Sequence, residues 1–530
     1  MKFQIIVTPS VLWDKISDPP YGALSVAAVL RKAGHDVRIE CGDVERFDYN
    51  ELKRRIRQYS PDVIGISSVL STAYKYVKET TLALKRDFPG LPIIVGGGLG
   101  AAAELVLEHT GTDIVVIGEG DITIEELAKK IEKKESYRDV EGIAYKEGGV
   151  IMRTGPRRPI VDLDTLKYPA FDLIDMTKYF MDIREIFSSF RHYKKQDERL
   201  LAPQRSRHML RIMISRGCIG GCTFCYRPVP GQRHFSFDYI FDYLEYLMCT
   251  FNINAFSFGD ECFAPTLEWN RRFVEELNRR NIDIVFQILG MRVDTVDPEV
   301  LRAFKKAGCF MIIYGFESGS QKMLDIMEKR AAVEQNIRVA RWTKEAGIYT
   351  SPNFIFGMPG ETTETIKESI QFLKKLDYGA CWYQYAYPLA VPGTPLYEYA
   401  KLTGLIKNEE QYLEEASYSN VHDMNTGAFI NFTSSSIEIL TIWPKLVEDE
   451  LRRHYSRGIL GYLVNKYIRP EAVLHNLRRF GLKVTAKEIL VRITGTKRSS
   501  QFRAPESCRR SEDTRLNSSH SRASRMPSSA

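Results

Sequence analysis

The sequence predicts an α/β protein with two strand–helix series in tandem. The first is a parallel sheet covered by helices, the second is a partial (β/α)6 barrel, and a mostly helical C-terminal region follows. Three observations support this prediction. Runs rich in β-branched residues alternate with runs of helical periodicity, glycine or proline stands at most junctions, and the alternation starts again near residue 208. Strands that alternate with helices form parallel sheets with helices packed on their faces.

The composition excludes several classes of protein. The chain has 530 residues, of which 44% are hydrophobic and 27% charged, the balance of a globular protein. The net charge is +7, but the tail from Lys497 has eight Lys/Arg and three Asp/Glu, which leaves only +2 for the rest. A nucleic-acid partner is therefore not expected. No apolar run is long enough for a membrane span, and the N-terminal run is too short for a signal peptide, so a cytoplasmic location is expected.

The first series brings its candidate ligand residues to one edge of a sheet. Strands are expected at Phe3–Thr8, Asp36–Glu40, Val63–Ser67, Pro92–Gly96 and Asp113–Ile117. Helices such as Tyr21–Lys32, Tyr74–Asp87 and Ile122–Lys133 lie between them, and a hairpin around Gly148-Gly149 and a proline-containing linker follow. Ligands of parallel sheets bind beyond the carboxyl ends of the strands. The residues there are Ser67, Ser68, Gly96, Gly97, Gly98, Gly118, Glu119 and Gly120.

The second series has six strand–helix units, which predict a partial barrel with its active site at the carboxyl ends of the strands. Strands are expected at Met209–Ser215, Ala255–Phe258, Asp283–Gln287, Phe310–Tyr314, Tyr349–Phe356 and Cys381–Tyr387. Helices are expected at Phe237–Cys249, Leu267–Arg279, Pro298–Ala307, Val333–Ala346 and Thr362–Leu376. The expected domains are 1–140, a hairpin and linker at 141–204, the barrel at 205–400, a helical region at 401–495 and a disordered, vector-like tail at 496–530.

Three cysteines after the first barrel strand form the central motif. Cys218, Cys222 and Cys225 have the spacing C-x3-C-x2-C, and soft thiolates so spaced suit an iron–sulfur cluster or zinc. Three ligands would leave one iron of a four-iron cluster open. Two alternative explanations stay open. The cysteines could be buried small apolar residues, or they could hold a structural zinc ion, which requires a fourth ligand.

Later segments, taken in order, make residues 205–400 resemble the radical SAM superfamily. Gly259–Glu261 lies where the family has a Gly-Gly-Glu-like stretch, Gly315–Gly319 is similar to its Gly-x-Glu-Ser-Gly segment, and Gly357–Thr362 matches Gly-x-Pro-Gly-Glu-Thr. The resemblance implies a [4Fe-4S] cluster on the three cysteines. It also implies contacts with S-adenosylmethionine (SAM) from Phe224, Gly259, Asp260, Glu261, Arg292, Glu317, Ser318, Gly357, Pro359 and Gly360. Taken singly, each could instead be a turn glycine, a helix-start carboxylate or a surface ion-pair partner.

The resemblance also implies the chemistry. The reduced cluster gives an electron to SAM, the C5′–S bond breaks, and the 5′-deoxyadenosyl radical takes hydrogen from an unactivated carbon, while the protein holds geometry and excludes water. No catalytic residue is identified. Cys262 and Tyr226 are candidates for hydrogen-atom transfer, with Tyr314 as a further residue that could face the cavity. For Cys262, packing as a small apolar residue is the favoured interpretation.

The N-terminal series resembles the Rossmann-like B12-binding domains that are fused to radical SAM domains. Asp18–Leu24, Gly34–Val37, Val95–Gly98 and Val116–Asp121 are the segments that resemble that family. The resemblance implies cobalamin against the edge residues named above, from Ser67 to Gly120. Because the chain lacks Asp-x-His-x-x-Gly, and His35 and His109 are interpreted as structural, this cobalamin would be base-off without a histidine ligand. A dinucleotide site at Gly96–Gly100, or a scaffold domain without a cofactor, are the alternatives.

Together these features identify the sequence as a member of the cobalamin-binding radical SAM enzymes, and C-methylation of a metabolite is the expected reaction. Radical oxidation, cyclisation or rearrangement without methyl transfer is one alternative, and a non-catalytic iron–sulfur or zinc-binding module is another. The expected partners are a small-molecule substrate and an electron donor such as flavodoxin or ferredoxin. Tyr383, Tyr385 and Trp382 could line the barrel mouth or pack as strand residues.

Overall fold

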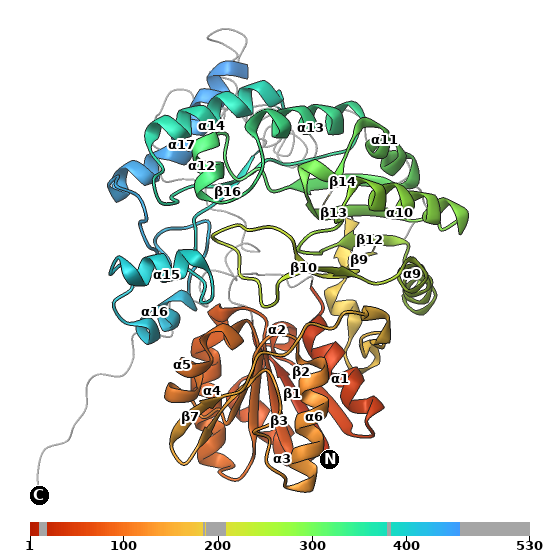
Figure 1. Ribbon diagram of the computed structural model, residues 1–530, viewed down its shortest axis with the longest axis vertical. Helices are drawn as coiled ribbons and strands as arrows, with labels where there is room; N and C mark the ends of the chain where they lie inside the picture. Colours follow the sequence, from red (N-terminus) through yellow and green to blue (C-terminus); the bar gives the residue numbers. More distant parts are fainter. Residues whose placement is uncertain (10–17, 184–185, 187–207, 379–382, 456–530) are drawn as a thin grey trace, which may run out of the picture. The chain divides into compact units, whose positions relative to one another are not determined.

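A computed structural model describes residues 1–9, 18–183, 186, 208–378 and 383–455 of the chain (Figure 1). Residues Met1–Leu451 form one compact unit, which holds both strand–helix series. A second unit begins at Arg452 and is described only as far as Tyr455. None of the described helices is long and apolar enough to cross a membrane.

The first sheet has seven strands in the order β2-β1-β3-β4-β5-β6-β7. The first five in this order are parallel, and β6 and β7 extend the sheet as an antiparallel hairpin. Their bounds are β1 Lys2–Val7, β2 Asp36–Cys41, β3 Val63–Ser68, β4 Ile93–Gly97, β5 Ile114–Val116, β6 Ile143–Glu147 and β7 Val150–Arg153. Most residues of β1, β3, β4 and β5 are buried, as expected for strands covered on both faces.

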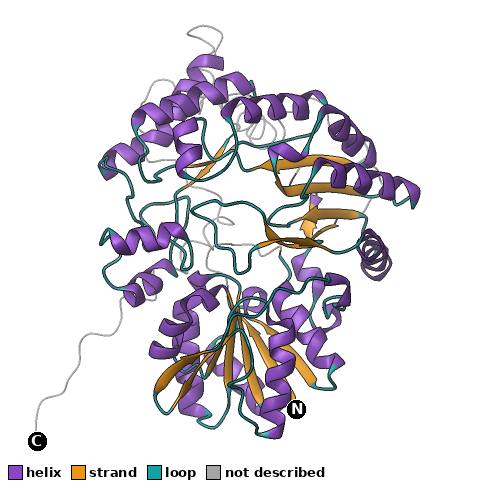
Figure 2. Ribbon diagram, in the orientation of Figure 1, coloured by secondary structure: helices purple, strands orange, loops and turns teal. Residues whose placement is uncertain are grey.

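Helices lie on both faces of this sheet (Figure 2). α1 (Tyr21–Lys32) packs against α6 (Gly120–Lys133), and α4 (Tyr74–Asp87) packs against α5 (Ala103–His109). α3 (Tyr49–Tyr59) buries only Leu52, Ile56 and Tyr59, a narrow apolar stripe at helical spacing. The short helix α2 (Gly42–Glu45) precedes it.

The second series begins with a five-stranded sheet in the order β14-β13-β12-β9-β8. The strands are β8 Met181–Asp182, β9 His208–Ile212, β12 Ala255–Phe258, β13 Val285–Met291 and β14 Cys309–Tyr314, and only β8 is antiparallel to its neighbour. β15 (Asn353–Ile355) and β16 (Gln384–Ala386) pair with each other in parallel. Single bridges from Met311 to Tyr349 and from Glu317 to Phe354 continue the curvature from β14. The result is the partial barrel that the sequence predicts.

Helices cover the outside of this barrel and continue beyond its last strand (Figure 1). They are α9 Phe237–Phe251, α10 Leu267–Arg279, α11 Pro298–Ala307, α12 Gln321–Ile326, α13 Val333–Glu345, α14 Thr363–Leu376, α15 Pro395–Leu402, α16 Glu409–Ala416 and α17 Ile437–Tyr455. Side-chain oxygens cap the N-termini of several, including Ser236 on α9, Thr266 on α10 and Asp297 on α11.

A single hydrophobic cluster joins the first sheet to the C-terminal part of the compact unit. It contains residues of the first sheet and its helices, residues of α12, and residues of α15, α16 and the segment after them. Representative members are Ile64, Val95, Leu99, Val106, Met323, Met327, Tyr397, Tyr412, Leu413 and Phe432. The two series therefore share one core instead of meeting through a wet interface.

The structure differs from the sequence-based prediction in three places. The first sheet is not wholly parallel, because β6 and β7 pair onto its edge. Residues 417–436 form turns and irregular segments although the region was expected to be mostly helical. The short elements α3 and α12 were not predicted, since their apolar stripes are narrow or short. The helical prediction beyond Tyr455, the tail at 496–530 and Trp382 lie outside the described residues.

Gly97 tests the tight packing at the carboxyl edge of the first sheet. Its φ is +94°, and an added Cβ would lie 2.2 Å from the Ser68 carbonyl oxygen. We expect Gly97→Ala to lower the free energy of unfolding by about 3 kcal/mol, because backbone strain and a clash with main-chain atoms add together. Denaturant unfolding measures this change.

Gly149→Ala is the matched control. Gly149 also has a positive φ, of +84°, but nothing lies within 4 Å of an added Cβ. That variant should lose only about 1 kcal/mol. Equal losses in the two variants would contradict the assignment of close packing at Gly97.

Candidate active site

The cysteine motif lies in a loop between two short antiparallel strands. β10 (Ser215–Cys218) pairs with β11 (Gly231–His234), so the hairpin ends are fixed on either side of the loop. Thr223, in the middle of the loop, is fixed by two main-chain hydrogen bonds. Its N–H donates to the Met327 carbonyl at 3.0 Å, and its carbonyl accepts from Leu396 N–H at 3.0 Å. α12 and α15 thus hold the loop from the other side.

The three thiols have different surroundings. Cys222 is buried, Cys218 is half-buried and Cys225 is exposed. A hydrogen bond from Cys262 lowers the pKa of Cys218 to about 6, and a hydrogen bond from Cys225 lowers the pKa of Cys222 to about 7. The thiolate is the form that binds metal. This donor set fits an iron–sulfur cluster, although no three His, Cys, Asp or Glu side chains in the described part of the chain already converge as a metal site.

Two cations lie beside the cysteine loop. Lys329 is largely buried, its Nζ donates to Glu317 Oε1 at 2.9 Å, and its charge lowers the pKa of Cys222. Arg292 pairs with Asp294, with Nε 2.9 Å from Oδ1, and its charge lowers the pKa of Cys218. Arg292 therefore makes an ion pair, as the alternative to SAM contact in the sequence analysis expected. It also contributes positive potential at the thiols.

Glu317 and Ser318 follow β14 but point in different directions. Glu317 has φ +59°, its backbone bonds to Asn353 and Ile355, and its carboxylate faces Lys329. Ser318 is buried, with its Oγ 3.3 Å from the hydroxyl of Ser369 on α14. The structure thus places Glu317 beside the cysteine loop and Ser318 in the barrel wall. Contact of either residue with SAM stays a prediction.

The segment Gly259–Glu261 braces the strand that leads into the cysteines. Asp260 is buried, and its Oδ1 accepts from Ile214 N–H at 2.8 Å and from the Ser215 hydroxyl at 2.6 Å. Burial raises the pKa of this carboxyl to about 7. An added Cβ at Gly259 would lie 2.7 Å from the Arg211 side chain, so a larger residue here would require Arg211 to move. Glu261 is more open, and burial followed by the nearby Cys218 raises its pKa.

The segment Gly357–Thr362 is organised by a buried carboxyl that sequence reasoning missed. Glu361 is fully buried, its Oε2 accepts from the Gly357 N–H, and burial raises its pKa to about 8. Pro359 and Gly360 lie at the outer part of this turn, where an added Cβ at Gly360 would meet Ile326 at 3.0 Å. Only Glu361's place in the motif could have indicated its role, because burial of a glutamate is rare and leaves no periodic pattern.

The remaining candidates are divided between the cavity side and the core. Tyr226 lies between the two series, because an added Cβ at Gly393 would be 3.0 Å from its ring and 3.1 Å from Ala101 of the first series. Cys262 is buried, with its Sγ 3.4 Å from the Ala264 carbonyl oxygen and also beside the Cys218 thiol, and a role in hydrogen-atom transfer stays a prediction. Phe224 packs against the shared core. Tyr314 does not face the cavity as suggested, since its hydroxyl lies 3.0 Å from Thr343 on α13.

The carboxyl edge of the first sheet is open and glycine-rich. The Ser68 hydroxyl donates to the Gly96 carbonyl at 2.7 Å and accepts from Leu99 N–H at 3.2 Å, which shapes the turn after β4. Val69 and Leu70, just after β3, are 61% and 44% exposed. Exposed apolar side chains next to a glycine-rich main chain could pack against the face of a large flat cofactor such as cobalamin.

Both N-terminal histidines belong to the opposite side of the sheet. His35 precedes β2, is largely buried, and its Nδ1 lies 3.3 Å from the N-terminal amine. His109 ends α5, with Nδ1 3.4 Å from Glu410. Neither lies at the glycine edge, and a cobalamin without a histidine ligand stays a prediction.

Buried ion pairs connect that glycine edge directly to the cysteine hairpin. Arg216, two residues before Cys218, places Nη1 2.6 Å from Asp121 Oδ2. Arg233 on β11 forms a bidentate pair with Glu119, both contacts at 2.9 Å. Burial tends to raise the pKa of Asp121, but the hydrogen bond and charge of Arg216 hold it below its usual value. Glu119 uses its carboxylate to fix the hairpin, and its contact with cobalamin stays a prediction.

A cavity of about 300 Å³ lies at this junction. Its lining comes from the glycine edge, the hairpin and the carboxyl end of β12. The lining includes Tyr21, Ser25, Gly118, Glu119, Gly120, Ser215, Arg216, Gly217, Val229, Tyr243, Asp260 and Glu261. Residues expected to bind cobalamin and residues expected to bind SAM therefore border the same space. Sequence reasoning missed Arg216, Arg233 and Lys329, because lone basic residues carry no spacing pattern.

Comparison with known proteins agrees with both halves of the site. Residues 212–373 match the family model of the radical SAM superfamily, and residues 18–128 match that of the B12 binding domain. An uncharacterised methyltransferase of Pyrococcus horikoshii is 26% identical over 487 residues, covering 88% of this chain and 97% of the relative. The anaerobic magnesium-protoporphyrin IX monomethyl ester cyclase of Rubrivivax gelatinosus is 26% identical over 67% of this chain, but the match spans only 62% of the cyclase.

Among solved structures, the cobalamin-dependent SAM radical enzyme OxsB, with aqua-cobalamin and SAM bound, superposes with a TM-score of 0.62. The two share 18% identity over 93% of this chain and 78% of OxsB, which shows a common fold. The chain belongs to the radical SAM enzymes that carry an N-terminal B12-binding domain. Its cofactors are a [4Fe-4S] cluster, SAM and cobalamin.

Removal of one thiol tests the cluster assignment. We expect Cys222→Ala to reduce SAM cleavage to the background level, because three thiolates are needed to hold the cluster. Cys249→Ala, at an exposed cysteine on α9, should keep full cleavage and iron content. The measurements are iron content and 5′-deoxyadenosine formation after anaerobic reconstitution, with circular dichroism to confirm folding. Retained cleavage in Cys222→Ala would refute the assignment.

The buried Glu361 predicts a pH dependence of stability. The folded protein keeps the Glu361 proton up to a pKa of about 8, whereas the unfolded chain releases it near 4.5. Stability should therefore fall as pH rises between these values, and Glu361→Gln should remove that fall. The free energy of unfolding of Glu361→Gln, relative to that of the native protein, should rise by on the order of a few kcal/mol from pH 5 to pH 8. Chemical unfolding at both pH values measures the gain.

Glu364→Gln is the control for this measurement. Glu364 lies three residues further along, in the first turn of α14, is exposed, and has a pKa lowered by the hydrogen bond from Lys367. Its replacement should produce no gain at high pH. Parallel pH profiles for Glu361→Gln and the native protein would contradict the role of the buried carboxyl.

Proposed function

We propose that this enzyme transfers a methyl group to a carbon atom of a small or medium-sized metabolite, in the cytoplasm. The observation that supports the proposal most directly is the shared cavity of about 300 Å³, bordered by the glycine edge and by the cysteine hairpin. A substrate carbon held there would be within reach of both cofactors, as methyl transfer through a substrate radical requires.

The bound groups supply the difficult chemistry: the cluster provides the electron that splits SAM into a 5′-deoxyadenosyl radical, and cobalamin carries the methyl group. The chain's own residues position these groups. Cys218, Cys222 and Cys225 would hold the cluster, and the Gly357 turn, braced by Glu361, would hold SAM beside it. Lys329 contributes positive charge at the cluster loop.

The residues at the junction would keep the reaction space closed. The pairs Arg216–Asp121 and Arg233–Glu119 hold the hairpin against the first sheet, so water can be excluded between the two cofactor edges. Tyr21 and Tyr243 line the same cavity with aromatic surface, which suits an organic substrate. No side chain is assigned as an acid or base in this proposal, since the radical carries the bond-breaking step.

A reaction without methyl transfer is the second candidate. The similarity to an anaerobic ester cyclase over 67% of the chain favours it, because that relative is named for a cyclisation. In this case the substrate radical would end in oxidation or ring closure. Both reactions need a low-potential electron donor such as flavodoxin or ferredoxin.

The product ratio separates the two reactions. Protein purified anaerobically from B12-fed cells should contain about one cobalamin per chain. With its true substrate, methyl transfer should yield 5′-deoxyadenosine and S-adenosylhomocysteine in about equal amounts. 5′-Deoxyadenosine without stoichiometric S-adenosylhomocysteine would exclude methyl transfer and favour the cyclase-like reaction. Protein with a full cluster but no cobalamin would also rule the proposal out.

A further inference from the structure

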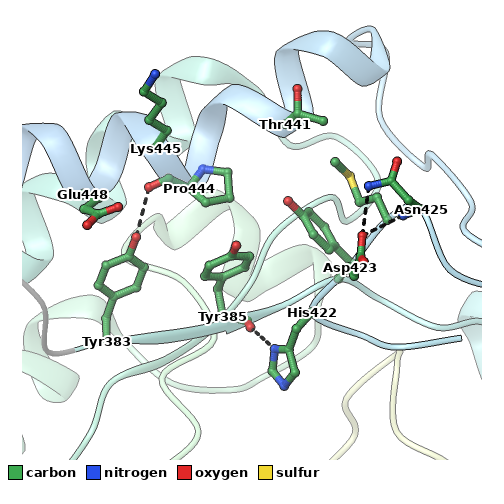
Figure 3. Close-up of a pocket in the computed structure, with 11 residues that line it drawn as sticks. Tyr383, Tyr385, His422, Asp423, Asn425, Thr441, Pro444, Lys445 and Glu448 are labelled. Atoms are coloured by element: carbon green, nitrogen blue, oxygen red, sulfur yellow. Dashed lines mark hydrogen bonds between the residues drawn. The ribbon is translucent and has the colours of Figure 1, made fainter. Parts of the chain in front are cut away.

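A second cavity, of about 340 Å³, lies between the β16 segment and α17 (Figure 3), and no residue of the cysteine loop lines it. Three tyrosines of the β16 segment, Tyr383, Tyr385 and Tyr387, supply one wall. Because strand side chains alternate, these three share one face while Gln384 and Ala386 occupy the other. The tyrosine face lies toward α17, which belongs to the helical layer outside the barrel. Tyr383 and Tyr385 thus do not line the barrel mouth but an outer cavity.

The tyrosine rings form a preorganised aromatic wall. The rings of Tyr383 and Tyr385 are 6.3 Å apart and 28° from parallel, and those of Tyr385 and Tyr387 are 5.8 Å apart and nearly perpendicular. Phe356 stacks behind Tyr385 at 5.5 Å, and the Tyr383 hydroxyl donates to the Pro444 carbonyl at 3.0 Å. These contacts fix the rings before any ligand arrives.

The hydroxyl of Tyr387 is a polar group without a use in the fold. Tyr387 is only 7% exposed and lines the cavity, yet its hydroxyl has no hydrogen-bond partner among the residues that the structure describes. The same is true of the half-buried Tyr385 hydroxyl. Both phenol oxygens are accessible from the cavity, and a phenol oxygen can accept a hydrogen bond, so two of them in one cavity favour a ligand that carries hydrogen-bond donors.

The charges around the cavity select a cation. Asp423 and Glu448 line it, and after burial their charges help to raise the pKa of Tyr385. The lining has two basic residues. Lys445 extends away from the tyrosine rings (Figure 3), and the Nδ1 of His422 lies 2.6 Å from the main-chain carbonyl oxygen of Tyr385. Aromatic faces with carboxylates at their edge attract organic cations, and the planar guanidinium or amidinium group both stacks on rings and donates from its edge.

From this arrangement we infer that the cavity is a binding site for a planar organic cation, a guanidinium or amidinium group. The cation stacks on Tyr385 and donates hydrogen bonds to Glu448, Asp423 and the open phenol oxygens. A free metabolite and an arginine side chain of a protein share this chemistry. The inference stands apart from the methyl-transfer proposal, because binding at this outer cavity requires no turnover.

Calorimetric titration of the reconstituted holoenzyme with benzamidine tests the site, and benzamide serves as the uncharged probe of nearly the same shape. Benzamidine should bind, and benzamide should bind at least tenfold more weakly. Glu448→Gln should weaken benzamidine about tenfold, the loss of one charge-assisted hydrogen bond. Tyr387→Phe, which removes only the open hydroxyl, should weaken it several-fold without lowering the thermal unfolding midpoint.

Lys445→Gln is the matched control. Lys445 lies on the same helix, three residues before Glu448, and the substitution removes a charge of the opposite sign. It should leave benzamidine binding unchanged or strengthen it. Equal binding of benzamide, or equal weakening by Lys445→Gln and Glu448→Gln, would overturn the inference. Methylguanidine and N-acetylarginine amide, titrated in parallel, distinguish the two sources of the cation: the tighter binder identifies a free guanidine or a peptide side chain.

Discussion

The pairing of Arg216 with Asp121 is the contact on which the arrangement of the site depends. Arg216 lies two residues from the first cluster cysteine, and Asp121 lies at the start of α6, beside the glycine edge of the first sheet. Arg233 and Glu119 repeat the same connection one strand away. Ion pairs of this burial contribute little net stability, since desolvation offsets most of their attraction. Their effect is to fix register, so that the cysteine hairpin can meet the sheet in only one position.

The apolar core acts together with these pairs. The cluster that contains Val95 of β4 also contains Met327, directly after α12, and Leu413 of α16. Met327 in turn accepts the hydrogen bond that holds Thr223 in the cysteine loop. Core packing therefore supplies the free energy, while the polar contacts at its edge specify where the loop lies. This division explains why the polar residues near the site are buried and paired.

Much of the fold could be predicted from the sequence, because its elements are long and regularly spaced. The helices Tyr21–Lys32, Leu267–Arg279 and Pro298–Ala307 have the bounds that periodicity and capping indicate. The cysteine spacing and the glycine-rich strand ends indicated the candidate site, and residues of both regions border the same cavity. The ion-pair partners of Arg216 and Lys329 could not be predicted from the sequence. Nothing in the local pattern around Arg216 indicates a carboxylate about a hundred residues earlier, and nothing around Lys329 indicates one about a dozen residues earlier.

The shared core has a consequence for how this enzyme can be divided. Because α15, α16 and the segment up to Phe432 pack on the first sheet, the N-terminal series is not a detachable module despite being continuous in sequence. An exchange of the N-terminal domain between relatives would leave Leu413 and Tyr412 facing foreign surface. A folded chimaera would have to carry residues 395–432 together with the first domain. The segments that must be exchanged as a unit are therefore discontinuous in the chain.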